Sequence, residues 1–248
     1  MKYFFKEPLR EGLILKRTNR FLFEVLLSNN KIEICHCPAT GRIGNIVFNN
    51  IPCLLSINLE NKNRKTKYTV EAISLNNIDE KNKKWIGINQ NMANRFIEFF
   101  IKNNQLSNIV NYKNNLLREQ IIGNSKLDFL VDNKYIEVKT PLVIMPLKEN
   151  YKTNKNIEIK EKTKFNSFDR FIKHINELAN SLNTHEKAIL IDFYMFEANK
   201  FIPPKIKDHP IMKAVDMALK KGVEFWQVNA FFDKYGIEIT DYYINNFE

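Results

Sequence analysis

Residues 11–88 carry short runs of β-branched and aromatic residues, separated by polar turns such as Ser28-Asn29-Asn30. These runs occupy residues 12–15, 21–26, 31–35, 46–48, 53–57 and 68–73. Several short strands at such close spacing predict a small β-barrel or β-sandwich. A helix is predicted next, over residues 91–103, because Met92, Phe96, Phe99 and Phe100 follow helical spacing. The Asn-rich stretch after it predicts a boundary between a first domain, 1–107, and a second, 108–248.

Residues 108–248 alternate between helical and strand patterns. One face of an amphipathic helix is traced by Phe165, Phe168, Ile172, Ile175, Leu178 and Leu182. The nearly continuous apolar run 188–196 predicts a strand that is buried on both faces. A further helix over 209–221, ending at Gly222, and a strand over 223–228 follow. The second domain is therefore predicted to be α/β, which makes the whole chain α+β.

A hairpin is predicted where the strand-like runs 127–131 and 135–139 flank a short polar loop. Alternate side chains of a strand share a face, so Tyr135, Glu137 and Lys139 point the same way. A two-residue loop would set Leu130 opposite Tyr135 and Asp128 opposite Glu137. This register gathers the apolar residues on one core face, whereas a three-residue loop would mix them with the charged ones. The residues expected on that core face are Leu127, Phe129, Val131, Ile136 and Val138.

The predicted register places two carboxylates, Asp128 and Glu137, about 5 Å apart at Cβ. Such like charges repel unless a proton or a cation lies between them. Mg²⁺ or Mn²⁺ suits oxygen ligands of this kind, and water with a substrate phosphate would complete its coordination. Lys139 would add a positive charge beside the metal, and Glu119, at what the pattern suggests is a helix end, would add a ligand or a base. The alternative is a solvated strand face on which Glu137 and Lys139 form an ordinary ion pair.

Charge is unevenly distributed along the chain. Residues 1–107 hold 17 Lys and Arg against 9 Asp and Glu, a net of +8 out of the total of +10. A basic domain joined to a nearly neutral one predicts an anionic partner, held mainly by the first domain. Cations interspersed with Phe21 and Tyr68 suit a groove for single-stranded nucleic acid. The candidates are Arg17, Arg20, Lys65, Lys67 and Arg95, and we add Lys173 and His174 of the second domain, His174 as a phosphate contact.

Together, Asp128, the Glu137-Val138-Lys139 segment and the upstream Glu119 resemble the active site of the PD-(D/E)xK nuclease superfamily. The wider chain, over about residues 10–230, resembles the sugar fermentation stimulation protein (SfsA) family. The segments that carry this resemblance are 17–22, 36–41, 64–68, 94–95, 127–129, 135–139 and 173–174. It implies an OB-like barrel for 1–107 and, for 108–248, a nuclease-like α/β domain with a central mixed sheet. It also implies DNA binding and a role in regulating sugar metabolism.

Other features are expected to be structural or to exclude a class of protein. Cys35-His36-Cys37 lacks a second Cys/His pair for a zinc site, and Asp192 is expected to be a satisfied polar group in its strand. Three cysteines do not make a disulfide framework, and we find neither a secretion signal nor a membrane-spanning segment, so a cytoplasmic location is expected.

The leading hypothesis is a DNA-binding, metal-dependent phosphodiesterase. A non-catalytic transcriptional regulator and a small-nucleotide sensor are the alternatives. The sequence leaves open DNA against RNA, single against double strands, endo- against exo-cleavage, and the oligomeric state.

Overall fold

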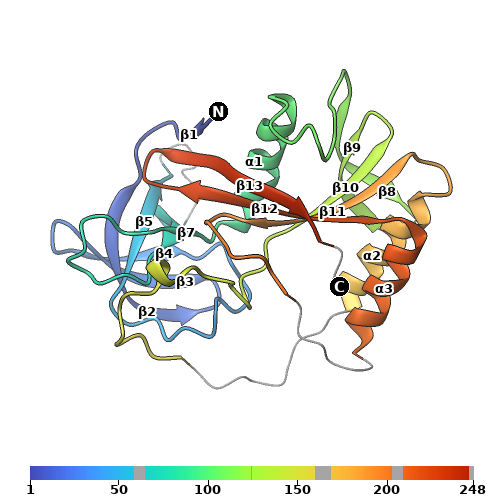
Figure 1. The fold of residues 1–248 in the computed structure, drawn as a ribbon. Coiled ribbons are helices and arrows are strands. Elements are labelled where there is room, and N and C mark those ends of the chain that lie inside the picture. Colours follow the sequence, from blue (N-terminus) through green and yellow to red (C-terminus); the bar gives the residue numbers. More distant parts are fainter. Residues whose placement is uncertain (59–64, 124, 160–168, 203–208, 246–248) are drawn as a thin grey trace.

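The computed structural model describes residues 1–58, 65–123, 125–159, 169–202 and 209–245. Its first part is a small closed barrel, shown in blue and teal in Figure 1. The strands are β2 (Arg10–Asn19), β3 (Leu22–Leu27), β4 (Ile32–His36), β5 (Ile51–Ile57), β6 (Tyr68–Ile73) and the short β7 (Ile86–Gly87). Neighbours run in the order β4-β3-β2-β5-β6-β7, and a parallel contact of His36 with Thr69 joins β4 to β6 and closes the barrel. The predicted small barrel is thus confirmed.

One predicted strand, at residues 46–48, is wrong. Ile46 forms only an isolated bridge with Ile159, and the residues that follow it belong to no strand. The backbone around this segment explains the difference, because Gly44, Asn45 and Asn50 all have positive φ angles, of 54°, 56° and 52°. Left-handed residues on both sides break the extended conformation that a ladder needs.

The barrel core holds alternate side chains of the strands together with the three cysteines, of which Cys37 directly follows β4. Cys35, Cys37 and Cys53 are free thiols with no exposed surface. Burial raises the pKa of Cys35 to about 12, which keeps that thiol protonated and unreactive. The cysteines therefore serve as small apolar core residues, as the sequence predicts for Cys35 and Cys37.

The second sheet has seven strands in the order β1-β13-β12-β11-β10-β9-β8. It is mixed, because β10 pairs in parallel with β11 and β11 with β12, while the other neighbours are antiparallel. The strands are β1 (Tyr3–Phe4), β8 (Leu116–Ile122), β9 (Ser125–Val131), β10 (Lys134–Lys139), β11 (Lys187–Tyr194), β12 (Glu224–Phe232) and β13 (Gly236–Ile244). The central mixed sheet is as expected.

Helices cover both faces of this sheet (Figure 1). α1 (Gln90–Lys102) packs in one core with Ile136 and Ile189, whereas α2 (Asp169–Ser181) and α3 (Pro210–Lys221) pack in another with Tyr135 and Leu190. Since neighbouring residues of a strand point to opposite faces, the two cores lie on opposite sides of the sheet. α3 begins at Pro210 and ends at Gly222, which has a φ of 98°. Of the predicted helical face, Phe165 and Phe168 lie outside the described residues.

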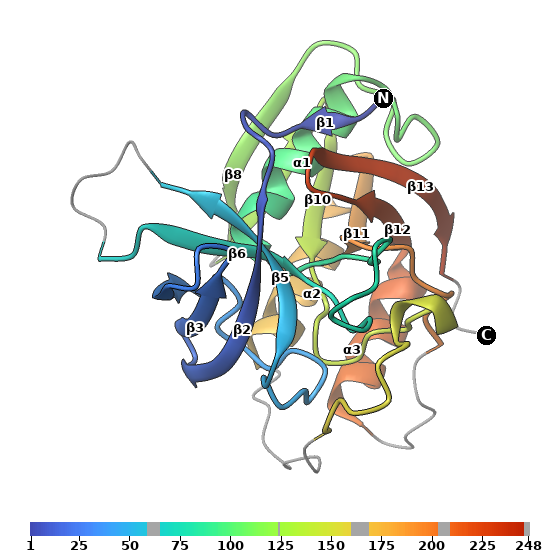
Figure 2. The ribbon, with the colours of Figure 1, turned by 90° about the vertical axis from the view of Figure 1, so that its left-hand side faces the viewer.

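The barrel and the second sheet each contain segments from the other part of the chain. β1, at the start of the chain, pairs with β13, and Figure 2 shows the two strands side by side. α1 follows the barrel in the chain but belongs to the core of the second sheet. Conversely, Tyr151, which ends a short 3-10 helix (Glu149–Tyr151), and Phe196, which follows β11, pack in the barrel core. The division at residue 107 stays a prediction, and the cores share segments across it.

No helix in the described part of the chain is long and apolar enough to span a membrane.

Candidate active site

The β9–β10 hairpin has the predicted two-residue loop. Leu130 pairs with Tyr135 and Phe129 with Ile136, which leaves Asp132 and Asn133 as the turn. Asp132 has a positive φ of 50°, and its carboxylate accepts hydrogen bonds from three successive backbone N–H groups, those of Lys113 (3.0 Å), Asn114 (3.4 Å) and Asn115 (3.2 Å). These bonds lower the pKa of Asp132. The turn is thereby anchored to the segment that leads into β8.

The β9–β10 ladder ends at the Phe129–Ile136 pair, so Asp128 and Glu137 are not a ladder pair as predicted, and the side chain of Asp128 bonds to β10 instead. Its Oδ2 accepts a hydrogen bond from the Val138 backbone N–H at 2.8 Å, and its Oδ1 accepts one from Asn94 Nδ2 of α1 at 2.7 Å. Burial raises the pKa of Asp128, and the negative charge of Glu137 raises it further. The carboxylate of Asp128 is therefore held close enough to Glu137 for the two charges to interact.

This interruption also corrects one detail of the predicted core face. Phe129, Val131, Ile136 and Val138 share the core under α1, but Leu127 packs with the other core, under α2 and α3. The β8–β9 ladder has no pair at Glu119 and Asp128, where Glu119 has a φ of 56°. Regular alternation along β9 ends at this point, so Leu127 does not follow the face of Phe129.

Glu137 is the most deeply buried acid of the group, with 3% of its side chain exposed. Its Oε1 lies 2.5 Å from Lys139 Nζ and 2.6 Å from His174 Nδ1, and these two nitrogens are 3.5 Å apart. Its Oε2 is buried and has no hydrogen-bond partner among the residues that the structure describes. A buried carboxylate oxygen without a partner is costly, so this atom is an acceptor available to a cation or a proton.

Glu119 is not brought to this group. It lies in strand β8 and not at a helix end, and its exposed carboxylate pairs with Lys126 Nζ at 2.6 Å. A hydrogen bond from Lys126 is the largest cause of its lowered pKa. Among the described residues no three His, Cys, Asp or Glu side chains are gathered in a metal-binding cluster. The candidate group is therefore Asp128, Glu137, Lys139 and His174.

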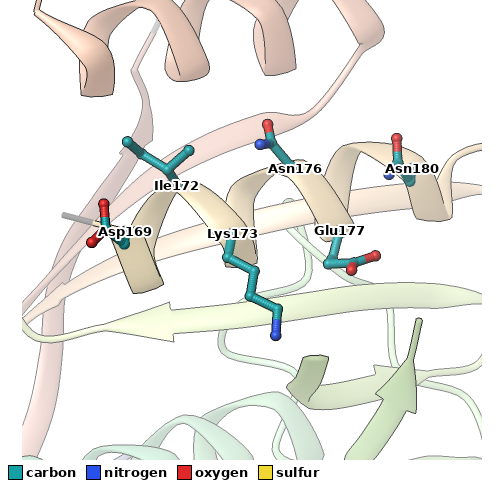
Figure 3. A pocket seen from close by; sticks show the side chains of 6 residues that line it. All are labelled: Asp169, Ile172, Lys173, Asn176, Glu177 and Asn180. Atoms are coloured by element: carbon teal, nitrogen blue, oxygen red, sulfur yellow. The ribbon is translucent and has the colours of Figure 1, made fainter. Parts of the chain in front are cut away.

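The two candidates on α2 have different surroundings. His174 is buried against Glu137, so it faces the acidic group as the sequence suggested. Lys173 is exposed and lines a pocket along α2 (Figure 3). Figure 3 shows Lys173 and Glu177 extending to one side of the helix, while Ile172 and Asn176 point to the other. No acid of the candidate group lines this pocket.

The cations of the barrel also differ from one another. Arg17 donates hydrogen bonds to the backbone carbonyls of Ala39 (2.6 Å), Gly41 (3.0 Å) and Arg20 (3.0 Å). Its guanidinium thus fastens the loop after β4. Arg20 instead lies over the ring of Phe21, 4.6 Å from its centroid, and Phe21 is 43% exposed.

The remaining predicted contacts lie on other elements. Lys67 lies 5.5 Å from the centre of the Tyr68 ring, but Tyr68 itself is buried. Lys65, close to it in the chain, is exposed, and Arg95 is exposed on α1. Arg20, with the exposed ring of Phe21, is therefore the barrel candidate that best suits base stacking.

Sequence reasoning missed two residues of this region. Asn94 of α1 holds Asp128, and its only signal was membership of a segment that carried the family resemblance. Asp192 of β11 lies beside Lys139 in the parallel β10–β11 register. Burial raises the pKa of Asp192 to about 7, and Lys139 opposes that shift. A charged residue within an apolar strand was a visible signal, but the expected satisfied polar group is wrong, because no described residue donates a hydrogen bond to Asp192.

The chain is similar throughout its length to a set of proteins with one description. Residues 15–88 match the family model described as the SfsA N-terminal OB domain. A sugar fermentation stimulation protein homolog of Clostridium novyi is 33% identical, over 92% of this chain and 93% of that protein. A homolog of Clostridium perfringens is 30% identical, over 97% of both chains.

A solved structure has the same fold. The structure of Pyrococcus furiosus SfsA in complex with Ca²⁺ matches 98% of this chain and 97% of that chain, with a TM-score of 0.73 at 21% identity. The OB-like barrel and the mixed sheet are therefore shared between the two proteins. Because the similarity to named relatives extends over nearly the whole length of both chains, this protein belongs to the sugar fermentation stimulation protein (SfsA) family.

Proposed function

We propose that this protein binds DNA and hydrolyses phosphodiester bonds at a divalent-cation site formed by Asp128 and Glu137. The observation that carries the proposal is the buried Oε2 atom of Glu137, for which the described part of the chain offers no hydrogen-bond partner. A cation bound there would compensate the desolvated charge. Burial and the negative charge of Glu137 raise the pKa of Asp128, and a nearby cation would oppose both effects.

The donor set suits a hard cation such as Mg²⁺ or Mn²⁺. Two carboxylates with water and substrate phosphate form a common Mg²⁺ site, so a cluster of three protein ligands is not required. Glu119, on its exposed strand, is not part of this set. The Pyrococcus furiosus SfsA structure is a complex with Ca²⁺, which supports a divalent cation in the family. A bound cation would activate water and neutralise charge on the scissile phosphate.

The neighbouring side chains have separate roles in this proposal. Lys139, with 26% of its side chain exposed, can reach both Glu137 and a phosphate in the site, and its ammonium would stabilise charge that develops on the phosphate. His174 touches Oε1 of Glu137 and so orients the carboxylate with Oε2 free. Asn94 and the Val138 backbone N–H hold Asp128. The site is thus preorganised by α1 on one side of the sheet and α2 on the other.

In this proposal the barrel binds the nucleic acid. Residues 1–107 hold 17 Lys and Arg against 9 Asp and Glu. The exposed Arg20–Phe21 pair combines a cation with an aromatic face, the combination that stacks on bases and contacts phosphates. Arg17 has a structural part in this surface, because its donors already bind backbone carbonyls.

The test is cleavage measured beside binding, with single- and double-stranded DNA and RNA in Mg²⁺, Mn²⁺ or EDTA. Lys139→Ala should retain binding and lose activity about a hundredfold or more, a typical loss for one transition-state donor. Glu137→Ala should abolish both cleavage and cation binding. Glu119→Ala is the matched control, since its carboxylate is exposed and paired with Lys126. Cleavage that persists in Glu137→Ala would contradict the proposal.

A non-catalytic DNA-binding regulator is the second candidate. The observation that favours it is that Lys139 Nζ and His174 Nδ1 both contact Glu137 Oε1. These contacts stabilise the carboxylate in part without a metal. In that case the wild-type protein would bind DNA tightly, and Glu137→Ala would leave that affinity unchanged. Failure of wild-type protein to cut any substrate in Mg²⁺ or Mn²⁺ would decide for this candidate.

A further inference from the structure

Asp192 is a carboxylate that the proposed chemistry does not use, and it lies next to the candidate site. In the parallel β10–β11 register Asp192 is paired with Lys139, and Leu190, two residues earlier, is paired with Glu137. Residues two apart on a strand share a face, so Asp192, Lys139 and Glu137 lie on the same side of the sheet. Among the described residues none donates a hydrogen bond to Asp192, and Lys139 is the positive group that acts on it.

In this structure Lys139 forms its ion pair with Glu137. Its ammonium lies 2.5 Å from Glu137 Oε1, the oxygen that His174 Nδ1 also contacts. A divalent cation on Glu137 would repel this ammonium and weaken its hold on Oε1. Because Lys139 has only 26% of its side chain exposed, an ammonium released there needs a new acceptor. Asp192 is the neighbouring carboxylate on the same face.

We propose that Asp192 is a positioning residue that accepts the Lys139 ammonium when Glu137 engages a divalent cation. The Lys139–Glu137 ion pair is then exchanged for a Lys139–Asp192 ion pair, with no covalent change. This inference rests on the proposed cation site. It also extends that proposal, because it makes cation binding and the placement of Lys139 parts of one rearrangement. An approaching ammonium favours the ionised form of Asp192, which opposes the effect of burial.

The test is a thermodynamic cycle in the full-length protein, with Ca²⁺ affinity measured by isothermal titration calorimetry. The variants are Asp192→Asn, Lys139→Met and the double variant, with Asp216→Asn as the matched control because Asp216 is exposed on α3. Asp192→Asn should weaken Ca²⁺ binding about tenfold, the lower end of the usual effect of a residue that supports a metal ligand. In the Lys139→Met background, where Asp192 has no ammonium to accept, the same change should alter the affinity by no more than about twofold, the scatter typical of such cycles. Asp216→Asn should leave the affinity unchanged.

The other outcomes separate the inference from the proposed function. An equal loss in both backgrounds would show that Asp192 acts without Lys139 and would overturn the inference while the cation site stands. Unchanged affinity in Asp192→Asn would overturn it as well. Absence of Ca²⁺, Mg²⁺ and Mn²⁺ binding by wild-type protein would overturn the proposed function and this inference together. A crystal structure with Ca²⁺ provides a second, independent check. In it, Lys139 Nζ should lie within hydrogen-bonding distance of Asp192.

Discussion

The carboxylate of Asp128 accepts a hydrogen bond from the backbone N–H of Val138, at the point where β9 stops pairing with β10. A side chain thus replaces a ladder bond, and the same carboxylate is tied to α1 through Asn94. This arrangement brings the first acid of the candidate site beside the second, since Val138 directly follows Glu137. Asp128 is therefore both a structural and a candidate functional residue.

Asp128→Ala should destabilise the protein by roughly 1–3 kcal/mol, because it leaves the Val138 N–H without an acceptor in a largely buried place. Asp128→Asn keeps a hydrogen-bond acceptor and removes a carboxylate whose pKa is raised by burial. It should therefore destabilise the protein less than Asp128→Ala does. Urea unfolding of the two variants measures the difference. Equal stability of Asp128→Ala and the wild type would show that the hydrogen bond contributes nothing.

Glu119→Ala should change neither Ca²⁺ affinity nor stability by a measurable amount, because exposed ion pairs typically contribute less than about 1 kcal/mol. Glu137→Gln should abolish Ca²⁺ binding at the site. Calorimetric titration of both variants tests this contrast. A large loss of Ca²⁺ affinity in Glu119→Ala would restore Glu119 as a ligand and imply that β8 rearranges on binding.

Asp192→Asn should stabilise the protein at high pH. The raised pKa of Asp192, about 7, means that the folded state holds a proton which the unfolded state has lost over the range from about pH 4 to 7. The free energy of unfolding therefore falls as pH rises through that range, and the amide removes this loss. We expect Asp192→Asn to raise Tm at pH 8 by on the order of 5 °C and to leave it nearly unchanged at pH 4. A lower Tm than wild type at pH 8 would show that the ionised carboxylate stabilises the fold.

Two kinds of arginine substitution in the barrel should have different effects. Arg17→Ala should destabilise the barrel by about 1–3 kcal/mol, because three backbone carbonyls lose their donor. Arg20→Ala should stay within about 0.5 kcal/mol of wild type, as for most surface substitutions. Thermal and urea unfolding provide the comparison. Equal losses in the two variants would mean that the hydrogen bonds of Arg17 are not what stabilises the loop.

DNA binding should depend steeply on salt, and the exposed barrel cations should set that dependence. Combining Arg20→Ala, Lys65→Ala and Lys67→Ala should reduce the slope of log K against log salt by about 0.7–0.9 for each phosphate that the variant no longer neutralises. The matched control replaces Lys113, Lys220 and Lys221, exposed lysines of the second part of the chain. Fluorescence anisotropy over a range of salt concentrations gives both slopes. An unchanged slope in the barrel variant would place the binding surface elsewhere.

Local sequence determined the features that depend on neighbours in the chain. The alternation of apolar and charged residues in the β9–β10 hairpin allows only one register that buries Phe129, Val131 and Ile136 together, and the structure has that register. The α1 helix was also predictable, because its apolar residues recur at helical spacing. The barrel strands were likewise predictable from short apolar runs, except at residues 46–48, where positive φ angles in the flanking residues broke the pattern.

Tertiary structure decided which side chains meet across the sheet. Glu119 lies on β8 and pairs with Lys126. Its own backbone is left-handed, and no hydrophobic periodicity in the sequence indicates that conformation. His174 reaches Glu137 only because α2 packs on the face that Glu137 shares. Asp192 lies beside Lys139 because the parallel pairing of β10 with β11, two strands separated in the chain by residues 140–186, fixes the register. Strand pairing over such a separation is decided by packing of the whole core, and a single sequence carries no local record of it.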